Sequence, residues 1–240
     1  MLIPIMPGVQ HITRTGQFLT TVTDLVTISP RMRRIALTAP AIAEQHWPLG
    51  CDLAVVLAGP DGREVRRRYT VRSVTNDTLL VDAVLHGHGP GSSWAAGLRL
   101  GDPVTFFGPR GEITLAEAGW LLALTDESGL PAVGALAEAL DAVNRPLRVL
   151  AEIADEAEHY PLPGNAEVRW LVRGSQPAGQ PDLLRAALDE ITPGAGPGYA
   201  YVLGESRAIV ALRDELGRFG LDRAAVYAKG YWNLNSRPTR

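Results

Sequence analysis

The residues best suited to chemistry stand in one octapeptide, RRRYTVRS, at positions 66–73. Along an extended strand successive side chains point to opposite faces, which places Arg67 and Tyr69 together on one face. Arg68 and Thr70 fall on the other face. The donors of an arginine guanidinium match a diphosphate, and a nearby tyrosine ring can lie flat against an isoalloxazine. This spacing therefore predicts a site for a phosphate-bearing aromatic ligand such as a flavin nucleotide.

Other reactive side chains have simpler interpretations. His86 and His88 lie two residues apart beside glycines, with no third ligand nearby in the sequence, so we expect a turn and a cofactor wall and no metal site. Asp126 and Glu127 could act as paired carboxylates, but acidic residues at the start of a helix are more simply partners of the helix dipole. Cys51 is the only cysteine, which excludes an internal disulfide and a cysteine-ligated iron–sulfur cluster. Any redox chemistry must then come from a bound cofactor.

The composition is that of an ordinary globular chain. Of the 240 residues 46% are hydrophobic and 20% are charged, and the formal net charge of −3 does not indicate nucleic-acid binding. No apolar run approaches the roughly 20 residues of a membrane span, and the N-terminal segment has no basic start, so we expect a cytoplasmic protein. Lys229 is the only lysine among the 23 basic residues. We attribute this preference for arginine to genome base composition.

Short strands separated by turns dominate the first half of the chain. Thr, Val, Ile and Leu are frequent in these segments, and prolines or glycines end them. Helical periodicity is almost absent, apart from one short helix predicted at 91–98, where a glycine and two serines suit an N-terminus. This pattern predicts a small antiparallel barrel. Its expected strands lie within 16–30, 31–40, 52–59, 66–74, 78–87 and 100–112.

From Trp120 onward strands alternate with helices. Continuous apolar runs such as WLLALTD are typical of buried parallel strands, and several precede a segment with an apolar stripe at helical spacing. Alternation of this type predicts a Rossmann-like parallel sheet with helices on both faces. The expected strands lie within 120–126, 146–155, 168–173, 199–206 and 225–232, and the helices within 128–140, 181–191 and 207–220. We therefore expect two domains, 1–116 and 117–240.

The pattern Arg-x-Tyr-Thr-x-Arg at positions 67–72 resembles the flavin-binding motif of the ferredoxin–NADP reductase superfamily. The form is that of the siderophore-interacting proteins, the ferric-siderophore reductases. Residues 81–112 are similar to that family's segment with a histidine after a strand, a Gly-rich turn, a Ser/Trp helix start and a Gly-Pro-Arg-Gly turn. TDESGLPAVGALAEAL, VLGES and KGYW resemble its later signatures. Together these motifs cover most of the chain from the octapeptide onward, in the expected order.

The resemblance implies that the barrel binds FAD. The diphosphate would lie between Arg67 and the helix start at Gly91, where the helix dipole and serine hydroxyls favour an anion. Tyr69 would stack on the isoalloxazine, Thr70 would hydrogen-bond its reactive nitrogen, and the strand around Val84, Leu85 and His86 would contact its pyrimidine edge. The residues expected to bind the cofactor in this domain are Arg67, Tyr69, Thr70, Val84, Leu85, His86, Gly91, Ser92 and Ser93.

The resemblance also implies an electron donor, NADPH or NADH, at the carboxyl ends of the strands in the second domain. Open parallel sheets bind their ligands at this edge. A ferredoxin stays open as an alternative donor. Arg173, at the end of the third strand of this domain, is a candidate for selecting a ribose phosphate. The further cofactor-binding residues expected here are Thr125, Asp126, Tyr231 and Trp232.

The activity implied is reduction of a ferric siderophore. Oxygen ligands hold Fe(III) far more tightly than Fe(II), so one electron from the flavin loosens the metal and Fe(II) is released in the cytoplasm. The expected catalytic residues are Thr70 and Lys229, and the expected cationic rim that attracts the chelate consists of Arg72, Lys229, Arg34 and Arg110. Two alternatives stay open. One is an NAD(P)H oxidoreductase with another acceptor, and the other is a siderophore- or flavin-binding protein without turnover.

Overall fold

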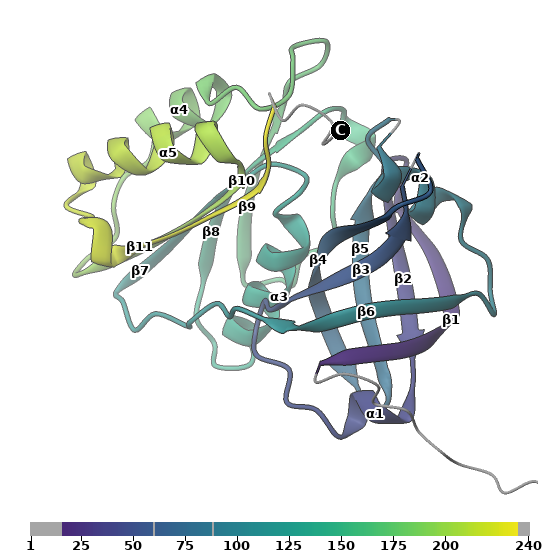
Figure 1. The fold of residues 1–240 in the computed structure, drawn as a ribbon. Coiled ribbons are helices and arrows are strands. Elements are labelled where there is room, and N and C mark those ends of the chain that lie inside the picture. The colour runs from purple at the N-terminus through teal and green to yellow at the C-terminus, as the bar shows by residue number, and fades with distance from the viewer. Residues whose placement is uncertain (1–15, 60, 88, 235–240) are drawn as a thin grey trace, which may run out of the picture.

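The computed structural model describes residues 16–59, 61–87 and 89–234. The first half of the chain forms a closed antiparallel barrel with its strands in the spatial order β1-β2-β5-β4-β3-β6, on the right of Figure 1. These strands are β1 (Gln17–Ser29), β2 (Met32–Thr38), β3 (Asp52–Ala58), β4 (Glu64–Thr75), β5 (Thr78–Val84) and β6 (Pro103–Arg110). Closure removes the open edges that a sheet of this size would otherwise present.

The barrel interior is filled by apolar side chains. Inward residues such as Ile35 and Phe106 are fully buried. Helix α1 (Pro40–Ala43) follows β2, and helix α2 (Pro90–Gly97) connects β5 to β6. The Arg33 guanidinium on β2 donates to three carbonyl groups at the C-terminal end of α2. These bonds satisfy acceptors that a helix end leaves unpaired, and they hold α2 against the barrel.

The second half is a parallel sheet with the strand order β11-β10-β7-β8-β9. The strands are β7 (Trp120–Thr125), β8 (Leu147–Ile153), β9 (Ala166–Val172), β10 (Gly198–Glu205) and β11 (Val226–Trp232). The helices are α3 (Leu130–Asp141), α4 (Asp182–Asp189) and α5 (Ser206–Glu215), with the short 3-10 turns η1 (Glu156–Glu158), η2 (Leu216–Phe219) and η3 (Arg223–Ala225). Helices α4 and α5 cover one face, and α3 covers the face toward the barrel (Figure 1). The predicted antiparallel barrel and Rossmann-like sheet are confirmed.

The segment between β6 and β7 connects the two halves. Strand β6 ends at Arg110 and β7 begins at Trp120, and the domain boundary that we propose between residues 116 and 117 falls inside this segment. Among the described residues, no helix combines the length and the apolar character needed to cross a membrane.

Helix α3 is buried along most of its length because it packs between the sheet and the barrel. Residues 130–137 are all buried, and the predicted apolar stripe of Val133, Leu136 and Leu140 lies in the core beneath the sheet. A Cβ added at Gly134 would lie 2.7 Å from Nε of Arg72 on β4. The glycine therefore lets the helix and the barrel strand come into close contact.

Five polar residues join the two halves, and we refer to them as the domain clasp. Arg72 is 6% exposed, forms an ion pair with Glu138 of α3, and donates to the Tyr160 hydroxyl oxygen at 3.0 Å. Tyr160 donates to Asp82 on β5, and Asp82 is paired with Arg34 at 2.7 Å. Because these groups are mostly buried and mutually paired, they fix the barrel against α3 and the loop after β8.

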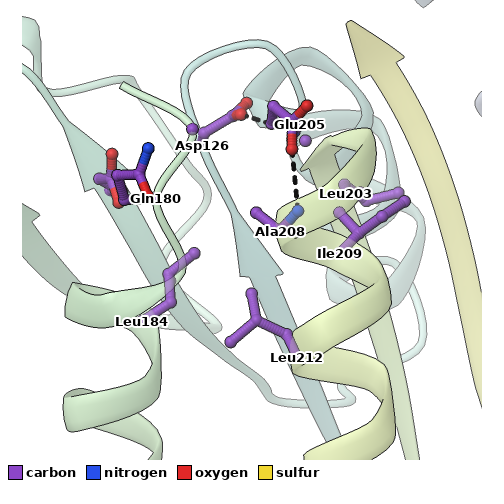
Figure 2. A pocket seen from close by; sticks show the side chains of 11 residues that line it. Asp126, Gln180, Leu184, Leu203, Glu205, Ala208, Ile209 and Leu212 are labelled. Carbon is purple, nitrogen blue, oxygen red and sulfur yellow. Dashed lines mark hydrogen bonds between the residues drawn. The ribbon is translucent and has the colours of Figure 1, made fainter. Parts of the chain in front are cut away.

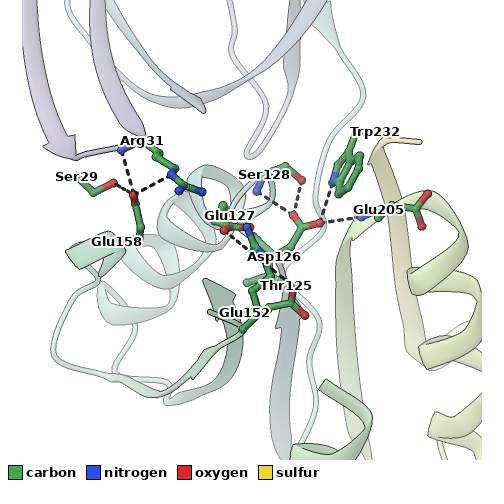
Figure 3. Close-up of polar contacts among 11 residues, drawn as sticks. Ser29, Arg31, Thr125, Asp126, Glu127, Ser128, Glu152, Glu158, Glu205 and Trp232 are labelled. Carbon is green, nitrogen blue, oxygen red and sulfur yellow. Dashed lines mark hydrogen bonds and ion pairs between the residues drawn. The ribbon is translucent and has the colours of Figure 1, made fainter. Parts of the chain in front are cut away.

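A second contact lies beside the clasp. Glu158 of η1 accepts hydrogen bonds from the Ser29 hydroxyl at 2.5 Å and from the Arg31 backbone N–H at 3.1 Å (Figure 3). The Arg31 guanidinium is 3.6 Å from the same carboxylate. The hairpin between β1 and β2 is thereby attached to the second domain.

Candidate functional site

A close contact between β4 and α2 shapes the site predicted from the octapeptide. A Cβ added at Gly91 would lie 2.7 Å from the Tyr69 hydroxyl oxygen and 3.3 Å from Cγ of Arg67. Nonbonded carbon contacts are most favourable at about 3.5–4 Å, so a side chain here would displace its neighbours. Glycine therefore allows the first turn of α2 to approach both residues. We call Arg67, Tyr69 and Gly91 the cradle.

The aromatic ring of the cradle has a defined environment. Tyr69 is half-buried against Trp94 of α2, with ring centroids 5.2 Å apart and planes inclined by 44°. This burial raises the pKa of the Tyr69 phenol above its usual value, while the charge of Arg67 acts in the opposite direction. The Arg67 guanidinium donates to the Arg66 carbonyl at 3.0 Å. Because a guanidinium has five N–H donors, this bond leaves others for a ligand.

The start of α2 supplies backbone donors next to the cradle. Pro90 opens the helix after Gly89, and no described side chain caps that end. Proline has no N–H, so the first backbone donors of the helix belong to Gly91 and Ser92. The N–H of Ser93, which the resemblance assigned to the diphosphate, is bonded to the Gly89 carbonyl at 3.0 Å. Ser92 is buried and Ser93 is exposed, so the group that Ser93 presents to a ligand is its hydroxyl.

The residues at the end of β5 and just after it divide between the two core clusters. Leu85 is half-buried and packs on the same core cluster as Tyr69. Val84 is also half-buried, but it packs on the core cluster that contains α3. His86 is exposed, and His88 lies outside the described residues. The structure therefore places Leu85 on the barrel core and Val84 toward the second domain.

A second group of residues meets at the seam between the domains, and we call it the seam cluster. Oγ1 of the buried Thr70 is 3.2 Å from Oδ1 of Asp52 on β3 and 3.2 Å from the hydroxyl oxygen of Tyr231 on β11. Nζ of Lys229 is 2.8 Å from Oδ2 of Asp52 and 5.1 Å from the centroid of the Tyr231 ring. Sequence reasoning missed Asp52, and the available signal was an aspartate at the start of the otherwise apolar strand DLAVVLA.

Burial keeps the Tyr231 phenol and the neighbouring Cys51 thiol in their neutral forms. Burial raises the pKa of Tyr231, and the carboxylates of Asp52 and Asp126 act in the same direction. Burial also raises the pKa of the neighbouring Cys51 thiol to about 12. Since the thiolate is the reactive form of cysteine, Cys51 is inert near neutral pH.

At the end of β7, the chain itself hydrogen-bonds both carboxylate oxygens of Asp126 (Figure 3). One oxygen accepts from the backbone N–H of Ser128 at 2.8 Å. The other accepts from the backbone N–H of Glu205 and from Nε1–H of Trp232, each at 2.9 Å. Gly204 makes room for this carboxylate, because a Cβ there would lie 2.7 Å from Oδ2 and its φ is +151°. Trp232 is thereby fixed to the second domain.

Glu205 fills the neighbouring position at the end of β10. Its carboxylate caps α5 by accepting from the N–H groups of Arg207 at 2.6 Å and Ala208 at 2.8 Å, and Figure 2 shows the bond to Ala208. The pocket between Asp126, Glu205 and helices α4 and α5 has a volume of about 10 Å³. That is room for about one water molecule. The chain's own carboxylates therefore occupy this edge of the sheet.

Two residues that were expected to face a dinucleotide form ion pairs or a hydrogen bond with other groups of the chain in the same region. Nη1 of Arg173 is 2.6 Å from Glu127 and 3.4 Å from Glu152, and the arginine side chain is 9% exposed. Burial raises the pKa of both carboxyls, that of Glu152 to about 7. Thr125 is fully buried and donates to the backbone carbonyl of Asp126 at 2.9 Å. Arg173 and Thr125 thus bind groups of the chain itself.

The expected cationic rim is only partly present. Arg34 and Arg72 belong to the domain clasp, where each guanidinium is paired with a carboxylate inside the junction. They do not lie on an exposed surface facing the cradle, and we do not retain them as substrate residues. Arg110 at the end of β6 is exposed, and its Cα pairs in register with that of Asp52. Lys229 and Arg110 are therefore the two expected rim residues that lie near the seam.

A closed barrel with this cradle, joined at a polar seam to a parallel five-stranded sheet, defines the two-domain class of ferredoxin–NADP reductase-like proteins. A family model described as a siderophore-interacting FAD-binding domain matches residues 54–113. Another, described as siderophore-interacting protein, matches residues 118–235. The chain belongs to the siderophore-interacting protein family.

Known proteins agree with this assignment. The chain is 32% identical over 182 residues to the ferric vibriobactin reductase ViuB of Vibrio cholerae, and the match covers 72% of this chain and 66% of that protein. It is 27% identical over 181 residues to the NADPH-dependent ferric-chelate reductase of Escherichia coli, covering 72% and 69% of the two chains. The crystal structure of a siderophore utilization protein from T. fusca has a TM-score of 0.82 at 30% identity, covering 92% of this chain and 94% of that chain. The family predicted from the motifs is confirmed.

Proposed function

We propose that the chain is an FAD-dependent ferric-siderophore reductase. It passes electrons from NADPH or NADH through the flavin to an Fe(III)-siderophore and releases Fe(II) in the cytoplasm, where reduced nicotinamide nucleotides are available. The FAD-binding-domain match of the barrel and the reductase names of two relatives support this proposal. The observation that carries it is the cradle, in which Gly91 lets the start of α2 approach Arg67 and Tyr69.

The residues of the cradle suit two parts of FAD, its diphosphate and its isoalloxazine ring. Arg67 and the backbone N–H groups at the start of α2 suit the diphosphate, since both form charge-assisted hydrogen bonds with an anion. The Tyr69 ring suits the isoalloxazine, with Thr70 on the opposite face of the strand. When bound, FAD supplies the redox chemistry, because it accepts a hydride and returns electrons one at a time. The residues that we propose to hold it are Arg67, Tyr69, Thr70, Val84, Leu85, His86, Gly91, Ser92 and Ser93.

The chain's own contribution to the reaction is positioning and charge. Reduction of Fe(III) to Fe(II) moves one electron and no proton, so the iron step needs no acid or base. We assign Thr70 and Lys229, which Asp52 holds together, to the reacting edge of the ring. Tyr231 closes the seam above Thr70 and excludes water from it. Lys229 and Arg110 are the proposed contacts of the chelate.

Each NAD(P)H molecule supplies the electrons that reduce two ferric chelates. NAD(P)H loses two electrons and a proton, so two Fe(III) chelates become two Fe(II) chelates for each donor oxidised. Hard oxygen ligands bind Fe(III) more tightly than Fe(II), and each reduction therefore loosens the metal without breaking the chelator.

One observation favours a ferredoxin as a second candidate donor. Open parallel sheets bind a dinucleotide diphosphate with the backbone N–H groups at strand ends and helix starts. In this chain Asp126 and Glu205 already accept such groups at the ends of β7 and β10. For NADPH or NADH, the residues that we propose to lie nearest the nicotinamide are Thr125, Asp126, Tyr231 and Trp232.

An anaerobic titration tests the proposed function. The FAD-loaded protein is mixed with NADPH, NADH or reduced ferredoxin while the flavin absorbance is followed, and a ferric siderophore is then added with an iron(II)-specific chromophore. The proposal expects bleaching by at least one donor, then reoxidation with two Fe(II) trapped per flavin. A flavin that is reduced normally but yields no Fe(II) from hydroxamate or catecholate chelates would refute the substrate. A protein that binds no FAD would refute the function.

A further inference from the structure

Two arginines of the octapeptide lie on the outside of the barrel beside the seam. Arg66 and Arg68 are exposed, and along the extended strand β4 they share the face of Thr70. Arg68 is two residues from Thr70, which is about 7 Å along the strand. Arg110 is exposed at the same border, and its Cα pairs in register with that of Asp52. Arginines therefore line the barrel side of the seam cluster.

Apolar side chains continue this surface across the neighbouring strands. Residues that are paired in an antiparallel sheet point to the same side of it. Val56 of β3 pairs with Arg66. Ala54 of β3 pairs with Arg68 on one side and with Phe107 of β6 on the other. We call this surface the barrel face, and its exposed or half-buried members are Leu19, Val56, Arg66, Arg68 and Phe107.

The barrel face combines residue types that are typical of protein interfaces. The guanidinium carbon of Arg66 lies 4.2 Å from the centroid of the Phe107 ring. Leu19 of β1 pairs with Thr105, which is two residues before Phe107, and Leu19 is 68% exposed. Arginine and aromatic residues are enriched in protein interfaces. Since three strand spacings separate β4 from β1, the face is about 15 Å wide.

The charges of this surface favour a negatively charged partner. Arg66 is paired with Glu64 of the same strand at 3.2 Å. The ion pair of the seam cluster adds no net charge. Among the described residues, neither Arg68 nor Arg110 forms an ion pair with a carboxylate. Two unpaired guanidinium groups therefore remain next to the seam, although the formal net charge of the chain is −3. A local surface of this kind orients an acidic partner as it approaches.

We propose that the barrel face is the docking surface for an acidic one-electron carrier protein of the ferredoxin type, which delivers its electron to the flavin at the seam. This inference rests on the proposed function and gives its donor a binding surface. A protein suits the face better than a chelate does, because the apolar end at Leu19 is about 15 Å from the arginines of β4. Each reduced carrier loses one electron and one Fe(III) chelate gains one, so the overall transfer consumes no proton.

The first test measures electron transfer to the unmodified holoenzyme. A plant-type [2Fe–2S] ferredoxin is photoreduced without oxygen and mixed with the FAD-loaded protein, and the flavin absorbance is followed by stopped flow. Salt is varied from about 0.01 M to about 1 M, which shortens the Debye length from about 30 Å to about 3 Å. We expect the second-order rate constant to fall about tenfold or more over this range, because the attraction is screened. A rate constant that does not change with salt, or no reduction of the flavin at any salt concentration, would overturn the inference.

Charge variants locate the docking surface. Arg68→Glu should lower the rate constant with ferredoxin about tenfold or more at low salt. Reoxidation of its photoreduced flavin by a neutral tris-hydroxamate ferric chelate should change less than about twofold, because that chelate has no net charge to attract. Leu19→Asp adds a carboxylate at the exposed apolar end of the barrel face and should also slow ferredoxin but not the neutral chelate. Arg223→Glu is the matched control for Arg68→Glu, because it makes the same change in net charge at an exposed position just before β11, at the end of that strand away from the seam.

The outcomes separate this inference from the proposed function. Equal effects of Arg68→Glu and Arg223→Glu on the ferredoxin rate would overturn the inference and leave the reductase function intact. Arg68→Glu could instead slow reoxidation by a trianionic ferric chelate while the ferredoxin rate stays unchanged, and this result would assign the face to the chelate and overturn the inference. Failure of every ferric chelate to reoxidise the flavin would refute the proposed function without changing the result for docking. If Arg68→Glu does not fold, the salt series and Leu19→Asp still decide.

Discussion

Gly91 is the position at which the cradle can be perturbed by a single methyl group. In Gly91→Ala the added carbon would lie 2.7 Å from the Tyr69 hydroxyl oxygen and 3.3 Å from Cγ of Arg67. Since comfortable carbon contacts are about 3.5–4 Å, the Tyr69 ring or the start of α2 must move by up to roughly 1 Å.

Two opposing contributions set the size of the effect. Overpacking costs about 1–3 kcal/mol, whereas replacing glycine by alanine within a helix stabilises it by about 0.5–1 kcal/mol. Without FAD the ring can move aside, so we expect the free energy of unfolding to change by less than about 2 kcal/mol. With FAD bound, Arg67 and Tyr69 must both reach the cofactor and the strain remains. Because about 1.4 kcal/mol is a factor of ten in Kd, FAD affinity should fall about tenfold or more.

The assay is an FAD titration followed by flavin fluorescence, with urea unfolding measured on the same samples. Gly97→Ala is the matched control, because it lies in the same helix and an added Cβ there meets nothing within 4 Å. We expect the control to gain slightly in stability and to keep its FAD affinity. Tyr69→Phe in the Gly91→Ala background removes the clashing oxygen and should recover part of the affinity.

Two results would refute this reasoning. FAD affinity of Gly91→Ala equal to that of the wild type would show that the cofactor does not depend on the contact between α2 and β4. An equal loss of affinity in Gly97→Ala would assign the effect to the helix as a whole and not to the cradle.

The remaining predictions concern the domain clasp, Glu152 near the end of β8, and Lys229. Glu138→Gln should cost about 3 kcal/mol and Arg72→Met about 1 kcal/mol in urea unfolding, because the arginine left behind is 5% exposed and the glutamate left behind is 52% exposed. A larger loss of unfolding free energy in Arg72→Met than in Glu138→Gln would contradict this role of the domain clasp. Burial raises the pKa of Glu152 from 4.5 to about 7, so the folded protein holds a proton there that the unfolded chain releases, and stability falls as pH rises through that interval. Glu152→Gln should remove this fall, which is at most about 1.4 kcal/mol per pH unit, and parallel wild-type and variant profiles would contradict it. Asp52→Asn should speed the reaction of Lys229 with an amine reagent several-fold in peptide mass spectrometry, because the ion pair with Asp52 is lost. Equal rates in the wild type and in Asp52→Asn would show that the ion pair is open in solution.

Local patterns were sufficient to predict the architecture. The alternation of apolar runs and helical stripes after Trp120 predicted a parallel sheet covered on both faces, because crossovers between parallel strands place helices there. Strand order could not be predicted in this way. Strand β6 closes the barrel by pairing with both β1 and β3, and those pairings depend on contacts between distant parts of the chain.

Part of the candidate site could also be predicted from the sequence, and part could not. The two-residue period of a strand was enough to place Arg67 and Tyr69 on one face, and the structure shows both against Gly91. Asp52 was missed because its role depends on Lys229, which arrives from the last strand. Arg72 shows the converse, since its place in a stripe of arginines did not reveal the carboxylate that α3 brings to it.

We propose that the cradle binds the diphosphate and ring of FAD at the seam of the two domains. A crystal structure of the protein with FAD would show where the cofactor lies. We expect diphosphate oxygens within hydrogen-bonding distance of the Arg67 guanidinium and of the N–H groups of Gly91 and Ser92, with the isoalloxazine against Tyr69. A flavin whose diphosphate lies away from Arg67, or at the carboxyl ends of the parallel sheet, would contradict it.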